Sequence, residues 1–242
     1  MQDEAEVQWK RVRDRYASSV EAQGCCSEGA CCTPGYSNEE LKGIPEEAVL
    51  GLGSGNPVRA AQIREGETVV DLGSGGGIDV FLAARLVGPH GRAIGIDMTP
   101  EMVALARRAA ARTGAENVEF HLGRIESLPL DDEIADVVVS NCVVNLSPDK
   151  PSVFREAFRV LRPGGRLVVS DIVQERDLAL TDDDCGCVAT ALLRRVYVDT
   201  VRSAGFAGIE ILSDEPWRTG SAGIEASAVT FVARKPAQEA NA

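Results

Sequence analysis

The feature that most constrains the fold is a regular alternation of β-branched runs and helical segments from Glu67 onward. The apolar runs are nearly continuous, as is typical of strands that are buried on both faces. Such an alternation predicts a parallel sheet covered by helices on both sides, which is a doubly wound α/β fold. The strands expected in this sheet are 68–73, 93–98, 118–123, 135–144 and 165–173.

The segments between these runs carry helix signals. In 99–112, Thr99 suits the N-cap, Pro100 suits the first helical position, and Gly114 lies where the helix should end. A further helix is expected over 151–161 because a proline again occupies its start. Both segments have the length that a crossover between parallel strands requires.

Glycine and proline mark the remaining boundaries. The run Arg-Pro-Gly-Gly at 162–165 is predicted to break the preceding helix and to turn the chain into the next strand. Near the end of the chain, the segments 208–214 and 228–236 have strand composition and are expected to form a hairpin-like pair. This pair would make a short C-terminal strand region.

Three regions are predicted along the chain. Residues 1–58 form an N-terminal arm, in which a helix over 4–21 is followed by a cysteine-rich loop. Residues 59–235 form the α/β domain, and residues 236–242 are expected to be a disordered tail.

Composition excludes several classes of function. The chain has 37 acidic and 25 basic side chains, for a net charge of −12, so a nucleic acid is not an expected partner. No apolar run approaches the roughly 20 residues that span a bilayer, so no membrane association is expected. The charged first residues do not resemble a secretory signal, and we expect a cytoplasmic protein.

A glycine-rich turn between a buried strand and a helix indicates a nucleotide-type cofactor site. Glycines let the backbone approach a ligand closely, and the helix N-terminus offers unpaired amides. Asp97 ends the next strand, where a carboxylate can accept hydrogen bonds from both hydroxyls of a ribose. The turn residues expected at the cofactor are Asp71, Gly73, Ser74, Gly75 and Gly77.

Seven cysteines in a chain without a visible signal peptide favour thiols for metal binding, redox chemistry or catalysis over structural disulfides. Cys142 follows a core strand at the carboxyl edge of the sheet, where such sheets bind ligands. The two histidines, His90 and His121, are not placed to act as general bases. Alternatives remain: Cys142 can be a small buried hydrophobe, and the N-terminal cysteines can form a zinc site or stay disordered.

The motif D-x-G-x-G-x-G, together with the acid that ends the next strand, resembles class I S-adenosylmethionine-dependent methyltransferases. A dinucleotide-binding dehydrogenase is the main competing interpretation. Within the methyltransferases, the segments 51–57, 97–102 and 140–150 resemble the arsenite methyltransferases. The cysteines of the segment 185–189 and the N-terminal cysteine pairs at 25–26 and 31–32 add to this resemblance.

The resemblance implies a cofactor, S-adenosylmethionine, and a product, S-adenosylhomocysteine. Ile125 would then lie on the adenine face, Glu126 would lie near the adenine edge, and Asn141 would border the methionine end. Met98 and Thr99 would also contact the cofactor.

The resemblance also implies a set of arsenic-binding thiols. Cys142 is the clearest match and Cys187 is the second, with Cys185 as its alternative. Three adjacent aspartates precede Cys185 and would raise the pKa of its thiol. The third ligand would be Cys31 or Cys32.

This thiol set is chemically reasonable, because trivalent arsenic is thiophilic and its lone pair needs no base to activate it. The catalytic thiols would be Cys142, Cys187 and Cys32.

The predicted enzyme transfers methyl groups from S-adenosylmethionine to thiolate-bound arsenite, which arrives free or as a thiol conjugate. A thiol reductant such as glutathione or thioredoxin would be required, and thioredoxin is a potential partner. We expect a monomer. Two other functions remain open, a methyltransferase for carbon or oxygen atoms of small molecules and a non-catalytic metalloid-binding protein.

Overall fold

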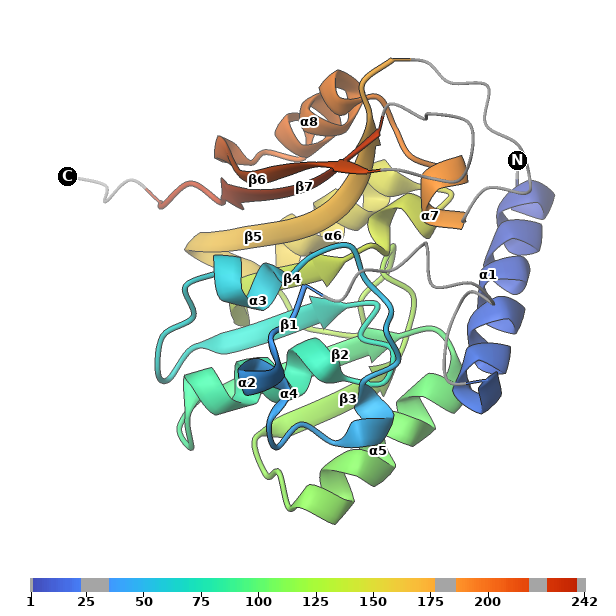
Figure 1. Ribbon diagram of the computed structural model, residues 1–242. Helices are drawn as coiled ribbons and strands as arrows, with labels where there is room; N and C mark the ends of the chain where they lie inside the picture. The colour runs from blue at the N-terminus through green and yellow to red at the C-terminus, as the bar shows by residue number, and fades with distance from the viewer. Residues whose placement is uncertain (1, 23–34, 177–185, 218–225, 239–242) are drawn as a thin grey trace.

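The computed structural model describes residues 2–22, 35–176, 186–217 and 226–238, and these form a layered α/β structure around one seven-stranded sheet (Figure 1). The strands lie in the order β3-β2-β1-β4-β5-β7-β6. The first five in sequence pair in parallel, and β7 runs antiparallel between β5 and β6. Their bounds are β1 (Thr68–Leu72), β2 (Arg92–Asp97), β3 (Val118–Leu122), β4 (Ala135–Asn141), β5 (Leu161–Gln174), β6 (Ala207–Trp217) and β7 (Ala226–Arg234).

Helices cover both faces of this sheet. One face packs against α3 (Pro57–Ala60), α4 (Ile78–Val87) and α5 (Pro100–Thr113). The other face packs against α6 (Lys150–Val160) and α8 (Arg194–Ser203). The doubly wound α/β fold is therefore confirmed, as is the antiparallel pairing of the two late strands. No described helix is both long and apolar enough to cross a membrane.

The remaining elements are short or lie outside these layers. The long helix α1 (Gln2–Ala22) stands beside the edge toward which the arrows of β1 and β2 point in Figure 1. The others are α2 (Asn38–Leu41), η1 (Glu46–Ala48), η2 (Val144–Leu146) and α7 (Gly186–Ala189).

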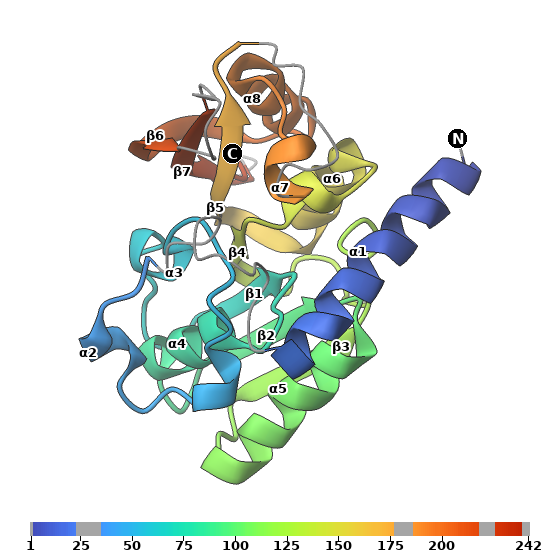
Figure 2. The ribbon, with the colours of Figure 1, turned by 45° about the vertical axis from the view of Figure 1, so that its right-hand side comes forward.

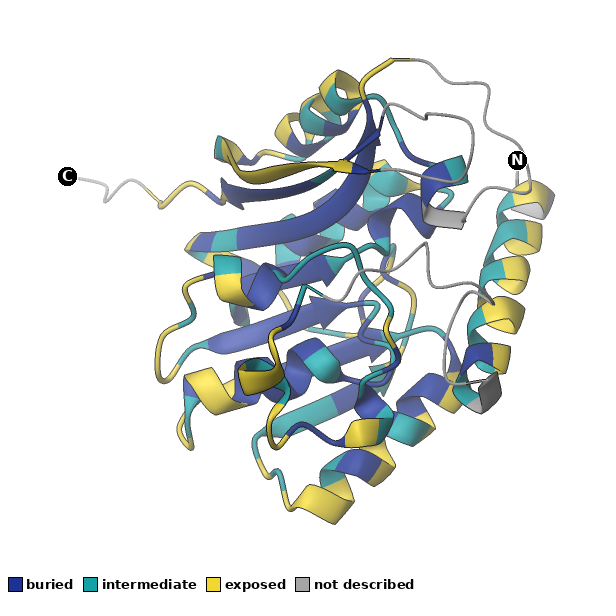
Figure 3. Cartoon of the chain, viewed as in Figure 1, coloured by how far each residue is buried: buried dark blue, intermediate teal, exposed yellow. Residues whose placement is uncertain are grey.

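Burial on both faces of the central strands explains their continuous apolar runs. In β1, Val69 belongs to the core on the α4 side, whereas Val70 and Leu72 belong to the core on the α6 side. All three are at most 1% exposed, and Figure 3 shows the central strands as buried. Each such side chain stabilises the fold by about 1.5–3 kcal/mol through removal of apolar surface from water.

Three predicted strand boundaries differ from the structure by three or more residues, and one of them is the end of β6, which lies at Trp217 and not at residue 214. The segment 162–165 does not precede β5 but lies within it as an irregularity, because the pairing with β4 jumps from Leu161 to Arg166. Gly164 adopts a φ of 82° there, which favours glycine. Strand β4 ends at Asn141, three residues earlier than predicted, because Cys142 takes a left-handed φ of 60° that an extended strand excludes.

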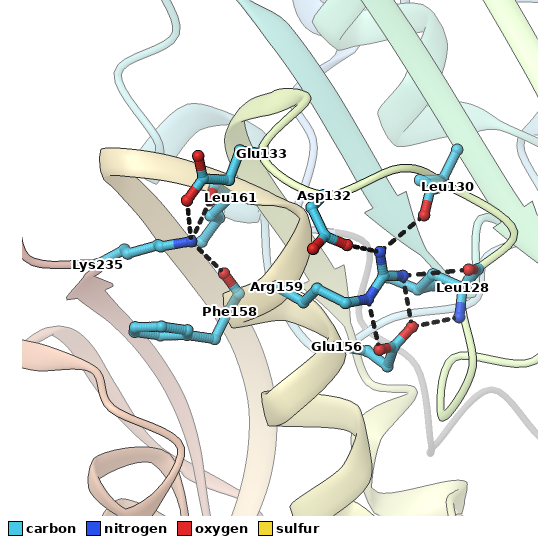
Figure 4. A network of polar contacts seen from close by, with 9 residues as sticks. All are labelled: Leu128, Leu130, Asp132, Glu133, Glu156, Phe158, Arg159, Leu161 and Lys235. Carbon is cyan, nitrogen blue, oxygen red and sulfur yellow. Dashed lines mark hydrogen bonds and ion pairs between the residues drawn. The ribbon is translucent and has the colours of Figure 1, made fainter.

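A polar network fixes the end of α6 and the loop that leads away from the candidate site (Figure 4). Lys235 donates from Nζ to the carbonyl oxygens of Phe158 and Leu161, at 3.0 and 2.7 Å, which satisfies carbonyls at the helix C-terminus. Arg159 pairs with Glu156, whose Oε2 accepts the backbone N–H of Leu128 at 2.7 Å. The loop that follows Ile125 and Glu126 is thus anchored to α6.

Candidate active site

A cleft opens at the carboxyl ends of β1, β2 and β4. The sheet order reverses between β1 and β4, and open α/β sheets bind ligands at such a switch point. Of the predicted cofactor residues, only Gly77 does not line the cleft. The predicted residues that line it are Asp71, Gly73, Ser74, Gly75, Asp97, Met98, Thr99, Ile125, Glu126, Asn141 and Cys142.

The glycine-rich turn brings its backbone against β2 and leaves the cleft side open. The N–H groups of Gly73 and Ser74 both donate to the carbonyl oxygen of Ile96, at 2.8 and 2.9 Å. A Cβ on Gly73 would lie 2.3 Å from Val143 Cγ2, so no other residue fits there. A Cβ on Gly75 would meet no atom within 4 Å. Gly77 is instead the N-cap residue of α4, with a φ of 95°, and a Cβ there would lie 2.8 Å from Phe120 Cζ.

Asp97 ties this turn to the start of α5. Its Oδ2 accepts the N–H of Gly75 at 2.9 Å, and its Oδ1 accepts the N–H of Thr99 at 2.8 Å. Thr99 does occupy the predicted N-cap position, although its side chain makes no capping hydrogen bond. Burial raises the pKa of the Asp97 carboxyl, and the two backbone N–H groups oppose that rise.

Of the four carboxyl side chains that line the cleft, Asp71, Asp79 and Asp97 lie near the glycine-rich turn. Asp71 is 3% exposed, and burial followed by the nearby Asp79 and Asp97 raises its pKa well above the usual range. Burial also raises the pKa of Asp79 to about 6. A bound cation would relieve the mutual repulsion of these groups, so the cleft suits a positively charged ligand.

A hydrogen-bonded cluster beside these acids was missed by the sequence analysis. Tyr36 donates its hydroxyl to Asp79 at 2.8 Å and accepts the side-chain N–H of Asn141 at 2.8 Å. The same amide group of Asn141 donates to the carbonyl of Gly55 at 2.9 Å, and its oxygen accepts the N–H of Ser54 at 3.0 Å. Asn141 thus lines the cleft, and its amide joins three chain segments, while its contact with the methionine end of a cofactor stays a prediction.

Helix α1 forms a wall of the cleft, which the sequence also did not predict. Trp9 donates from its indole N–H to Glu126 Oε1 at 3.0 Å, and the Arg124 guanidinium lies 3.8 Å from the centre of the Trp9 ring. Val12 and Tyr16 line the cleft one and two turns further along. Figure 2 shows α1 crossing in front of the sheet edge near α5. The helical spacing of Val12 and Tyr16 was the available signal for the packing of α1, whereas no local signal marks the bond between Trp9 and Glu126.

Of the predicted arsenic-binding cysteines, Cys142 is the one whose side chain the structure describes. Cys142 is half-buried, lines the cleft, and packs with an apolar cluster that includes Ile172 and Val188. Val188 belongs to α7, and this short helix therefore packs close to the Cys142 turn. Cys187 is the residue before Val188 in the same helix. Cys31, Cys32 and Cys185 lie outside the described residues. Within the described part of the chain, no three His, Cys, Asp or Glu side chains are placed so that together they could hold a metal ion.

The chain is similar in sequence to several known proteins. A family profile described as a methyltransferase domain matches residues 63–210. An arsenite methyltransferase of Halobacterium salinarum is 46% identical over 224 residues, which are 83% of this chain and 57% of that protein. The arsenite methyltransferase of Aquipseudomonas alcaligenes is 39% identical and covers 85% of this chain and 64% of its own length. The chain therefore spans less than two thirds of these curated relatives.

A solved structure gives the same result. The crystal structure of an arsenic(III) S-adenosylmethionine methyltransferase from Chlamydomonas reinhardtii aligns with a TM-score of 0.68 and 32% identity. The alignment covers 91% of this chain and 74% of that one. Fold, cleft and sequence likeness agree, and the chain belongs to the arsenite methyltransferase family of class I methyltransferases.

Proposed function

We propose that this protein methylates trivalent arsenic with S-adenosylmethionine as the methyl donor. The observation that carries the proposal is the position of Cys142, which lines the same cleft as the glycine-rich turn. A thiophilic substrate and a cofactor can therefore meet at the carboxyl edge of β1 and β4. The names of the relatives and of the solved structure support the choice of arsenite.

The described residues suit S-adenosylmethionine. The open cleft side of Gly75 leaves room for a ligand against the backbone, and Ser74 Oγ is buried without a hydrogen-bond partner in the described structure. Asp97 would accept the ribose hydroxyls, while Asp71 would face the positively charged methionine end. Ile125 would contact the adenine face, and Glu126, Met98 and Thr99 would complete the pocket. The bound cofactor supplies a methyl group on a positively charged sulfur.

Arsenic would be held by sulfur atoms from separate parts of the chain. Cys142 is the first ligand, Cys187 or Cys185 is the second, and Cys31 or Cys32 is the third. Packing of α7 in the same apolar cluster as Cys142 supports the second assignment. The thiolates would direct the arsenic lone pair toward the methyl group, so no base has to remove a proton from the nucleophile. Consistent with this, no histidine lines the described cleft.

The products would be methylated arsenicals and S-adenosylhomocysteine. Oxidised arsenic or a disulfide formed among the cysteines would have to be reduced, so turnover would require a thiol such as glutathione or a protein such as thioredoxin. We further propose that the enzyme acts as a monomer in the cytoplasm.

The test is arsenic speciation after incubation of the full chain with arsenite, glutathione and methyl-labelled S-adenosylmethionine. We expect labelled methylarsenicals from the wild type and a rate lower by about 100-fold from Cys142→Ser, because a displaced nucleophile loses its alignment. S-Adenosylhomocysteine affinity, measured by calorimetry, should stay within about twofold in the variant, since Cys142 is not a predicted cofactor ligand. Undiminished arsenic methylation by Cys142→Ser would refute the thiol mechanism.

A further inference from the structure

The turn that carries Cys142 has an unusual backbone. Cys142 adopts a φ of 60°, in the left-handed region that a residue with a Cβ seldom occupies. Such a conformation is unfavourable and persists only where the surrounding structure holds it in place. One constraint is visible at the residue itself, where the N–H of Cys142 donates to the carbonyl of Ser170 in β5 at 2.8 Å.

A second constraint acts three residues further along the same turn. Asn145 lies in η2 and is completely buried. Its side-chain N–H group donates to Asp171 Oδ1 at 2.8 Å and to the carbonyl of Ile172 at 2.7 Å. Its backbone N–H donates to Asp171 Oδ2 at 3.3 Å. Both ends of the turn from Cys142 to Asn145 are thus bonded to consecutive residues of β5.

The acceptor of these bonds is itself held rigidly. Asp171 is completely buried, and its Oδ1 also accepts the N–H of Ile172 at 2.9 Å. Tyr197 of α8, which is 1% exposed, donates its hydroxyl to Oδ2 at 3.0 Å. A buried carboxylate with this many donors has little freedom to rotate. It therefore presents a fixed anchor to the turn.

Asn145 also has a feature that packing alone does not explain. Its Oδ1 is buried and has no hydrogen-bond partner in the described structure. An unpaired buried acceptor is unfavourable, so an apolar residue of the same shape would cost less if the position served only to fill the core.

We propose that Asn145 and Asp171 are a positioning pair that holds the Cys142 thiol at the wall of the cleft. The pair acts through the backbone of the turn and does not itself contact the substrate. The choice of arsenite as a probe rests on the function proposed above, whereas the placement of the thiol does not.

The test compares two variants that each remove hydrogen bonds to Asp171. Asn145→Leu keeps the approximate side-chain shape but removes the two side-chain bonds to Asp171 and to the carbonyl of Ile172, while the backbone bonds of the turn remain. Tyr197→Phe is the matched control, because it removes one bond to the same carboxylate from α8 and leaves the turn bonded. Native-state alkylation of Cys142 by iodoacetamide is followed by mass spectrometry of its peptide, with S-adenosylhomocysteine bound.

We expect Cys142 alkylation to accelerate at least about fivefold in Asn145→Leu and to stay within about twofold in Tyr197→Phe, because coupling is strongest between directly bonded groups. The KM for arsenite should rise about tenfold in Asn145→Leu, with S-adenosylhomocysteine affinity nearly unchanged. Equal alkylation rates in the two variants would overturn the proposal.

Two further safeguards separate the outcomes. If Asn145→Leu does not fold, Asn145→Ser removes the same contacts with a smaller polar side chain, and the same alkylation criterion applies. If the wild type does not methylate arsenite, the proposed function fails, but the alkylation rates still decide whether the pair positions the thiol.

Discussion

The two walls of the cleft are built by different means. The cofactor wall consists mainly of backbone from the turn after β1 and the end of β2, joined by Asp97. The thiol wall depends on side chains, since the Cys142 turn is bonded to Asp171 and packs against α7. Both walls join segments at similar sequence separations, 22 residues between Gly75 and Asp97 and 26 residues between Asn145 and Asp171, so the walls differ in the kind of contact that holds them.

Because of this difference, the two walls should tolerate different amino-acid substitutions. The cofactor wall binds through backbone amides, which do not depend on the identity of the side chain. It therefore requires glycine only at positions where a Cβ would have no room. A thiol site needs particular side chains in particular places, so it depends on buried bonds such as that between Asn145 and Asp171. We therefore expect substitutions in the cofactor wall to act through steric clashes, and substitutions in the thiol wall to act through the loss of side-chain bonds.

The largest expected effect tests the steric basis of the cofactor wall. Gly73→Ala would combine a φ of 70° with a Cβ 2.3 Å from Val143, which should lower the free energy of unfolding by about 3–5 kcal/mol. Gly75→Ala shares a positive φ but has open space, and should cost only about 1 kcal/mol. Urea unfolding of both variants measures this, and equal losses would contradict the steric account.

The next effect concerns cofactor binding. Asp97→Ala removes the acceptor of the Gly75 and Thr99 amides and the proposed ribose contact. We expect S-adenosylhomocysteine affinity to fall by about 1.5–3 kcal/mol, the usual value for hydrogen bonds to charged groups. Calorimetry measures this, with Glu119→Ala as a control, because Glu119 pairs with Arg92 on the exposed part of the neighbouring strand. Unchanged affinity in Asp97→Ala would remove Asp97 from the cofactor wall.

Features of this molecule that depend on local sequence signals could be predicted, whereas contacts between distant residues could not. Strand alternation and the glycine motif are local signals, and they placed the sheet, the turn and Asp97 correctly. Trp9 was missed because its partner Glu126 lies 117 residues away, and Tyr36 was missed because Asp79 lies 43 residues away. Such pairings arise from tertiary packing and leave no periodic trace in the sequence. The predicted start of β5 after the segment 162–165 was wrong, because a bulge can accommodate a Pro-Gly-Gly run without ending the strand.

A smaller loss of stability is expected at Tyr36, which lies between the two walls and bonds to both Asp79 and Asn141. Tyr36→Phe removes both bonds without changing the shape of the ring, and should reduce the free energy of unfolding by about 1–2 kcal/mol. Chemical denaturation measures the loss. Thr200→Val, which removes a hydroxyl that donates to the Val196 carbonyl within α8, serves as the control and should change little. A loss in Tyr36→Phe no larger than in the control would show that the cluster does not stabilise this boundary.

The smallest expected effect is a pH dependence on the thiol wall. Burial raises the pKa of Asp171 to about 7 from an ordinary value of 3.8. Between these values the folded protein keeps a proton that the unfolded chain has lost, so stability falls as pH rises. From pH 6 to pH 7 the wild type should lose about 1 kcal/mol more than Asp171→Asn, which cannot titrate there. Parallel stability curves for the two proteins would contradict the assignment.

The most direct test of the central claim is the coordination of arsenic itself. X-ray absorption at the arsenic edge, on the full chain with one equivalent of arsenite and S-adenosylhomocysteine, counts the sulfur neighbours. The account predicts three sulfur neighbours in the wild type and two in Cys142→Ser, because trivalent arsenic forms three bonds and prefers thiolates. An identical sulfur shell in the two proteins would show that Cys142 does not bind arsenic.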